Sequence, residues 1–174
     1  PCDAAPATSI TAYCYYWYCP ITQLFGPNIY RNNILRNIRM AGTIYGGYTY
    51  YASGNMYHNT FSYDDPNNAT ALTIYGVYTY YSSSYANIEF RNNIISITRA
   101  GSGTNYGLYV GATGGGLYIS NNDIYVNAPS STNYLGYHPS PGTCSFSPAG
   151  ISSWTAGVDP LGAFVNPLYV NYNT

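Results

Sequence analysis

Hydrophobic and polar residues alternate along short stretches of the chain, and one such stretch recurs three times in nearly the same letters. The copies occupy residues 43–51, 73–81 and 104–110, and their first residues lie 30 and 31 positions apart. Alternation with a period of two, in segments rich in Tyr, Thr, Ile and Val, is typical of β-strands. Windows of about 11 to 18 residues show no amphipathic helical stripe. The pattern therefore predicts a strand-rich unit that is used repeatedly, with almost no helix.

A second motif, in which an Asn precedes an apolar residue by two positions, recurs at a similar spacing. It occurs at residues 31–35, 58–61, 91–95 and 120–124. A unit of about 30 residues with two or three short strands fits one coil of a parallel β-solenoid, whose coils stack about 4.8 Å apart. Propeller blades need about 40 to 50 residues and leucine-rich repeats need a Leu ladder, so both fit worse.

The expected fold is therefore all-β: a parallel β-helix (β-solenoid) with coils of about 30 residues and little or no helix. Residues 28–174 are expected to form the β-helix with its C-terminal closing segment. Residues 1–27 are expected to form an N-terminal segment that carries disulfides and acts as a cap or an interface. Each end of such a stack is expected to be an open sheet edge.

Residues 106–111 and 116–127 resemble consecutive strands of the right-handed parallel β-helix (pectate-lyase-like) superfamily, in its secreted bacterial form. Trp154, the Asp159-Pro160 pair and residues 165–170 are similar to the closing segment of such proteins. The resemblance covers about residues 28–170 and implies a right-handed coil. It does not fix an activity, because the superfamily holds lyases, hydrolases, adhesins and structural fibres. For Asp159 the expected role is that of a turn or capping residue.

The resemblance also implies a register, because family members point residues such as Leu108 and Val110 inward. Side chains that recur at the coil spacing then form columns. The expected outward columns are Tyr48, Tyr78 and Tyr109, and beside them Tyr50 and Tyr80. The expected inner apolar ladder is Leu35, Phe61, Ile95 and Ile124. A ladder of amides, which bond one another along the axis at one corner of the coil, is expected from Asn33, Asn59, Asn93 and Asn122.

Charge is scarce, with five Arg, no Lys, six acidic residues and a net charge of −1. Such a chain has neither a basic field for nucleic acid nor an acidic face for cations. Its hydrophobic fraction of 46% excludes wholesale disorder. No apolar run is long enough to span a membrane as a helix. The start at Pro1, without a leader, and the composition are those expected of a mature extracellular protein, secreted or at the cell surface.

Four cysteines, Cys2, Cys14, Cys19 and Cys144, lie outside the repeated core, three of them in an N-terminal segment expected to be loop-like. Two disulfides are expected rather than a metal site, because a C-x-x-x-x-C spacing without a neighbouring His suits zinc poorly. Of the three possible connectivities, Cys14–Cys19 with Cys2–Cys144 is preferred.

The acidic residues offer little catalytic chemistry. Asp64 and Asp65 lie together on what is expected to be the longest loop, where they form a weak candidate calcium site, although a solvated loop is the simpler interpretation. Glu89 and Asp123 fall on different strands. No nucleophile motif, phosphate loop or metal signature is present, so no cofactor is expected. Asn68 heads a sequon for N-linked glycosylation on the same loop.

Outward tyrosines on an uncharged surface suit an interface with another subunit or stacking on sugar rings. Tyr16 and Trp17, in an aromatic and uncharged N-terminal stretch, also suit an interface. The sequence favours a non-catalytic structural subunit that self-assembles into a surface filament or matrix fibre. The alternative is a carbohydrate-active β-helix, either a polysaccharide lyase or hydrolase or a binding or adhesin module. An ice-binding solenoid ranks last, because the expected register turns Thr43, Thr73 and Thr104 inward.

Overall fold

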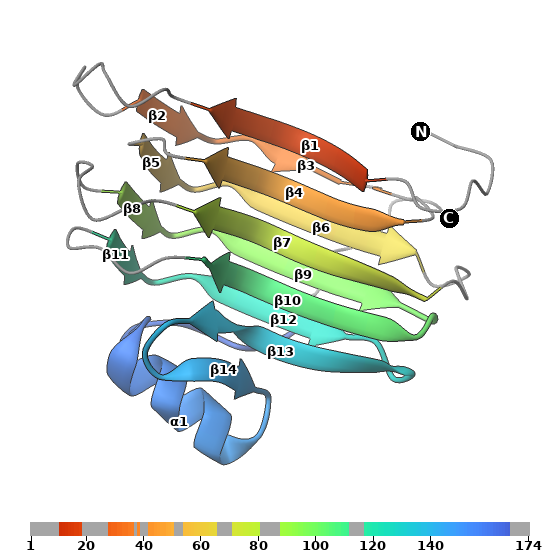
Figure 1. Cartoon of the computed structure of the whole chain (residues 1–174). Helices are drawn as coiled ribbons and strands as arrows, with labels where there is room; N and C mark the ends of the chain where they lie inside the picture. Colours follow the sequence, from red (N-terminus) through yellow and green to blue (C-terminus); the bar gives the residue numbers. More distant parts are fainter. Residues whose placement is uncertain are drawn as a thin grey trace.

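Three sheets of parallel strands run along one common axis in this computed structural model (Figure 1). The structure describes residues 11–18, 28–36, 38, 42–50, 54–65, 71–80, 88–111 and 117–167. Each of the first four coils contributes one strand to each sheet, and each strand pairs with its counterparts in the adjacent coils, so the strands of the first coil have neighbours on one side only. The chain is therefore an all-β parallel β-helix, as its repeat spacing predicts.

The widest wall, sheet A, contains β1 (Thr11–Tyr18), β4 (Thr43–Tyr50), β7 (Leu72–Tyr80), β10 (Gly103–Val110) and β13 (Ser131–His138), and it ends in the antiparallel strand β14 (Gly142–Ser145). Sheet B contains β2 (Asn28–Arg31), β5 (Gly54–Tyr57), β8 (Ile88–Arg91) and β11 (Leu117–Ser120). Sheet C contains β3 (Ile34–Leu35), β6 (Thr60–Asp65), β9 (Ile94–Arg99) and β12 (Asp123–Asn127). One short helix, α1 (Pro148–Gly157), follows β14.

The inner apolar ladder has the register that the repeat predicts. Leu35 pairs with Phe61, Phe61 with Ile95 and Ile95 with Ile124 in sheet C, and the last three residues are completely buried. In sheet A, Leu108 pairs with Val77 and Val110 pairs with Thr79, and all four are buried. Complete burial of an aliphatic or aromatic side chain contributes about 1.5–3 kcal/mol, so the repeated apolar positions are the main source of cohesion between coils.

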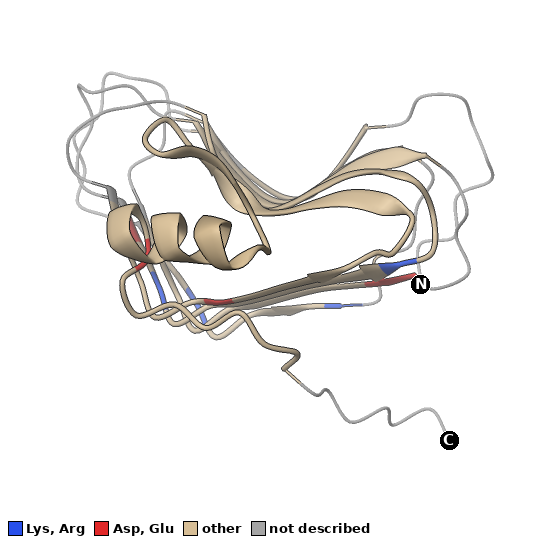
Figure 2. Cartoon of the chain, turned by 90° about the horizontal axis from the view of Figure 1, so that it is seen from below, with Lys and Arg blue, Asp and Glu red and all other residues tan. Residues whose placement is uncertain are grey.

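The strands of sheet A break their alternation at mid-length. In β4, Gly46 and Gly47 are both buried, and the pairing with β7 passes from Tyr45 directly to Gly47. A Cβ at Gly46 would lie 1.3 Å from the Tyr63 hydroxyl and 2.4 Å from the carbonyl oxygen of Gly76. The missing side chain therefore lets this wall approach the opposite one. Figure 2, a view from below the stack, shows the strands of one wall dipping inward at mid-length.

The C-terminal end of the stack is closed. Helix α1 begins after Ser147, whose Oγ accepts a hydrogen bond from the Gly150 N–H at 3.1 Å. Its Trp154 is completely buried, and a Cβ at Gly136 of β13 would lie 2.5 Å from that indole ring. The helix and β14 therefore cover the last coil (Figure 1). The expectation of two open ends is wrong at this end, because the closing segment folds back over the core.

At the N-terminal end, strands β1, β2 and β3 have no further strand outside them among the described residues. Side chains at this end stay open to solvent: Tyr13 is 47% exposed, Tyr16 54%, Tyr18 52%, Ile29 59% and Ile34 71%. Residues 11–18 form a regular strand paired with β4, so this part of the expected loop-like segment belongs to sheet A. The molecule thus has one closed and one open end within its described part.

Candidate functional site

The four asparagines expected at one corner lie one above another and bond in a single direction. Each Nδ2 donates to the Oδ1 of the next amide at 3.0 Å, from Asn33 to Asn59, from Asn59 to Asn93 and from Asn93 to Asn122. The backbone N–H of each donor residue bonds to the same oxygen, at 2.9–3.1 Å. Each of these amides thus replaces the backbone partner that a strand loses at a corner.

The residues before these asparagines explain why the chain turns there. Asn32, His58, Asn92 and Asn121 all have positive φ angles, of 54–60°. Asn is one of the few residues with a side chain that tolerates this left-handed conformation, so an Asn-Asn pair both makes the corner and satisfies it.

The ladder ends on a buried carboxylate. The N–H and the Nδ2 of Asn122 donate to Asp159 Oδ2 at 3.1 and 2.9 Å. Burial raises the pKa of Asp159 above its ordinary value, although the hydrogen bonds from Asn122 oppose this shift. Asp159 therefore takes the place of the next asparagine in the ladder and accepts the two hydrogen bonds of Asn122. In this sense Asp159 caps the ladder at its last asparagine.

Tyrosine side chains form three columns on the outer, concave face of sheet A. Column one is Tyr13, Tyr45, Tyr75, Tyr106 and Tyr134; column two is Tyr16, Tyr48, Tyr78, Tyr109 and Tyr137; column three is Tyr18, Tyr50 and Tyr80. Neighbouring rings within a column are 4.8–5.8 Å apart and within 22° of parallel. Columns one and two meet edge to face, with Tyr45 and Tyr48 5.2 Å apart at 86°.

This packing decides which part of each ring a ligand can reach. Because every ring lies flat on its neighbours, its faces are covered except at the two ends of a column. Desolvation raises the pKa of Tyr48 and of Tyr75 to about 12, and that of Tyr78 further, so these phenols, which are neutral at physiological pH in any case, remain neutral donors in alkaline solution as well. The mid-column surface offers ring edges and hydroxyl groups, whereas stacking on a sugar ring needs a free face.

Strict alternation did not predict column one. Counting by twos from Val110 turns Tyr106 and Thr104 inward, but the break at Gly107 places both on the outer side. The same break corrects the argument that Thr43 and Thr73 point inward, since their neighbours Ile44 and Ile74 are the buried residues. A Tyr-x-x-Tyr spacing, which occurs in each of β1, β4, β7, β10 and β13, is the sequence signal for the paired columns.

The acidic candidates do not converge. Asp64 and Asp65 are the last residues of β6 rather than part of a loop, because they pair with Thr98 and Arg99 of β9. Consecutive strand residues point to opposite faces, and Asp64 accepts a hydrogen bond from Thr98 Oγ1 at 3.1 Å. No group of three or more potential metal ligands occurs in the described part of the chain. Asn68 lies outside the described residues.

Glu89 has structural partners on sheet B. The hydroxyl of Tyr57 donates to Glu89 Oε2 at 2.5 Å, and Arg91 Nε lies 3.4 Å from the same oxygen. This carboxylate therefore links two adjacent coils across the outer surface of sheet B.

The described cysteines lie at opposite ends of sheet A, Cys14 in β1 and Cys144 in β14, so they are not bonded to each other. Cys144 is buried, which raises the pKa of its thiol. Cys2 and Cys19 lie outside the described residues, as does the side chain of Trp17, whose backbone belongs to β1.

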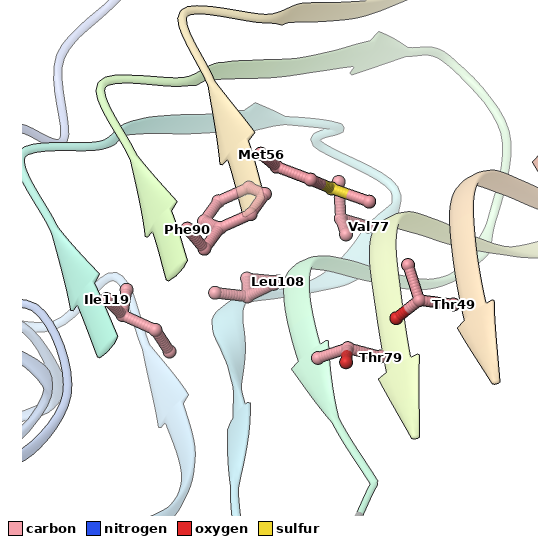
Figure 3. Close-up of a pocket in the computed structure, with 7 residues that line it drawn as sticks. All are labelled: Thr49, Met56, Val77, Thr79, Phe90, Leu108 and Ile119. Carbon is pink, nitrogen blue, oxygen red and sulfur yellow. The ribbon is translucent and has the colours of Figure 1, made fainter. Parts of the chain in front are cut away.

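A small cavity of about 10 Å³ lies between sheets A and B (Figure 3). It is lined by Thr49, Met56, Val77, Thr79, Phe90, Leu108 and Ile119. The hydroxyls of Thr49 and Thr79 have no hydrogen-bond partner among the described residues. A space of this size holds about one water molecule, so it is a packing gap rather than a ligand pocket.

No protein-family model, no curated protein and no solved structure matches the chain. None of the helices in the described residues is long and apolar enough to cross a bilayer.

Proposed function

We propose that this chain is a structural β-solenoid subunit that associates with copies of itself, in an extracellular filament or matrix fibre. The open N-terminal end carries this proposal. Edge strand β1 presents Tyr13, Tyr16 and Tyr18 about half exposed, and it contains no charged residue or proline. Natural sheets blunt an exposed edge with Lys, Pro, bulges or a covering segment, and an edge without such protection is a template for pairing.

Two further features support association over sugar binding. The ring faces that would stack on a sugar are covered along the columns and become free only at their ends, where a second subunit would meet them. The surface also carries few charges, and the absence of Lys removes the residue that most often keeps sheet edges apart. The proposed extracellular location rests on the scarcity of charge and on the four cysteines. The proposed membership of the pectate-lyase-like superfamily rests on the resemblance of the coil sequence.

Sedimentation velocity from about 1 to 100 μM tests the proposal, since this range brackets affinities typical of weak to moderate assemblies. We expect the wild-type protein to shift to larger species as its concentration rises, and Tyr16→Lys to remain monomeric. Tyr118→Lys is the matched control, because Tyr118 is equally exposed, at 51%, but lies on β11 away from the open end. A wild-type protein that stays monomeric over the whole range would contradict self-association.

A further inference from the structure

The strands of sheet A have an inside-outside pattern that reads the same in both directions. In β4 the outer residues are Thr43, Tyr45, Tyr48 and Tyr50, and the inner residues are Ile44, Gly46, Gly47 and Thr49. The order is out, in, out, in, in, out, in, out. Strand β1 pairs with β4 from Thr11 to Tyr18 except at Cys14, and Cys14 acts electrostatically on the buried Tyr63, which places its thiol on the inner side. The strand therefore follows the same pattern about a centre between Cys14 and Tyr15.

Contacts of β1 agree with this assignment. Tyr13 and Tyr16 stack on Tyr45 and Tyr48 on the outer face. Tyr15 packs on Tyr30 at 4.1 Å and belongs to the partly buried residues around the core. The outer and inner sides of the open edge are therefore defined by its own packing.

We propose that two copies join at their N-terminal ends about a two-fold axis, with β1 of one antiparallel to β1 of the other. This inference rests on the self-association proposed above and gives it a geometry. Directly opposed residues of an antiparallel pair carry their side chains on the same face. With the axis between Cys14 and Tyr15, Tyr13 lies opposite Tyr16 of the second copy, and outer residues face only outer residues.

The mid-strand break makes this register possible. In a strand with unbroken alternation, an axis between two residues would place every outer side chain opposite an inner one. Here both residues beside the axis are inner, so the two patterns match. The inward dips of the two walls also coincide at the axis, and the small Cys14 lies opposite the large Tyr15 of the second copy.

The tyrosine columns continue through such a junction. Tyr13, at the end of column one in the first copy, meets Tyr16, at the end of column two in the second copy. The two-fold axis generates the equivalent pair, in which Tyr16 of the first copy meets Tyr13 of the second. The exposed end faces of these rings, on side chains 47% and 54% exposed, become covered in the same stacked arrangement that holds the coils together. Both columns would then run without interruption across the two molecules.

A head-to-tail contact lacks this match. It would place β1 against β14, whose four residues are Gly-Thr-Cys-Ser, with no tyrosine to extend a column. Strand β14 instead puts Ser145 beside Tyr134 and Thr143 beside Tyr137, so both columns end there. The closed end therefore stops the stack, so this contact alone yields a closed pair, and a filament built from such pairs would need a second contact elsewhere on the molecule.

Charge swapping tests this geometry. One variant carries Tyr13→Lys with Tyr16→Lys, and a second carries Tyr13→Glu with Tyr16→Glu. We expect each to be monomeric alone, because like charges would face each other across the axis, and an equimolar mixture to form a species of twice 19.0 kDa. Tyr118→Lys should leave wild-type association unchanged.

The outcomes separate the two proposals. Wild-type association that the mixture fails to restore would overturn the two-fold geometry and leave self-association standing, whereas a wild type that never associates would overturn both. If the charged variants do not fold, particle images of wild-type assemblies decide instead. Pairs with α1 at both outer ends support the geometry, and particles with α1 at one outer end only overturn it.

Discussion

Asn93 illustrates how one side chain holds three coils together. Its Nδ2 donates to Asn122 Oδ1 and to the carbonyl oxygens of Met56 and Arg91, and its Oδ1 accepts from both the N–H and the Nδ2 of Asn59. The side chain is 1% exposed, so water cannot replace these partners. A buried polar group without a hydrogen-bond partner costs about 1–3 kcal/mol, and the Asn93 amide is the partner of several such groups.

We therefore expect Asn93→Ala to lower the free energy of unfolding by about 2 to 4 kcal/mol. Urea denaturation followed by circular dichroism measures this change. Asn127→Ala is the control, since Asn127 is exposed at the end of β12, and it should change stability by less than about 0.5 kcal/mol. Equal effects of the two substitutions would show that the ladder contributes little.

Asp159 gives the stack an unusual dependence on pH. Its pKa in the folded protein is raised by burial above the ordinary value of 3.8. The folded state therefore holds this proton more tightly than the unfolded chain does. The stabilisation that protonated Asp159 gives to the folded state is fully present below pH 3.8, the pKa in the unfolded chain, and is lost as the pH rises through the higher pKa of the folded state. Asp123, whose pKa is also raised by burial, acts in the same direction.

We expect acidification from neutral pH toward pH 4 to stabilise the wild type relative to Asp159→Asn, because the amide keeps the acceptor for Asn122 but cannot titrate. Urea midpoints of both proteins at neutral pH and at about pH 4.5 measure the difference. A difference between the two proteins that is the same at both pH values would contradict this role of Asp159.

Strand β4 shows what a missing side chain does for an element. Adjacent glycines in its middle have different surroundings: a Cβ at Gly46 would collide with Tyr63 and with the backbone of Gly76, whereas a Cβ at Gly47 would meet Phe61 at 3.4 Å. The next coil carries Val77 in the position of Gly47. Only Gly46 is therefore required by the close approach of the two walls.

We expect Gly46→Ala to destabilise the protein by about 3 kcal/mol or more, since the strand must move away from Tyr63. Gly47→Ala is the matched control, one residue away, and should be neutral or slightly stabilising because it also restricts the unfolded chain. Thermal or urea unfolding of the two variants tests the contrast, and similar losses for both would contradict this account of the bend.

The same feature marks the limit of prediction from sequence. Period-two alternation placed the second half of each sheet A strand correctly, from Leu108 and Tyr109 onward, and the coil spacing gave the correct register of Phe61 and Ile95. It failed for the first half, at Tyr106, because a glycine that lets two walls meet leaves no mark on hydrophobic periodicity. Likewise, the partner of Asp159 could not be foreseen, since it depends on how the closing segment folds back.

At the scale of the whole molecule, the two ends differ in how well they are covered. The last coil is covered by α1 and β14, with Trp154 completely buried beneath them, while β1 to β3 lie at the open end. Stability in a solenoid is a sum over coils and their contacts with neighbours, so a coil with one neighbour opens more readily.

We expect amide hydrogen exchange of the monomer to be fastest in β1 to β3 and slowest in β7 and β10, with β13 close to the interior strands. Mass spectrometry of exchanged peptides at low protein concentration measures this gradient. Equal protection of β1 and β7 in the monomer would contradict it. Protection of β1 that grows with protein concentration would accompany the proposed pairing.

The carboxylate of Asp159 contacts Asn122 and none of the other three corner asparagines. At the opposite end, the open edge is formed by the first coil alone. The contacts at each end of the stack therefore do not depend on the number of coils between the two ends. Duplicating or excising one internal repeat would change the length of the stack and leave both the closing segment (α1 and β14) and the open edge at β1 unchanged. Length is thus an independent variable in this architecture, adjustable in steps of one repeat.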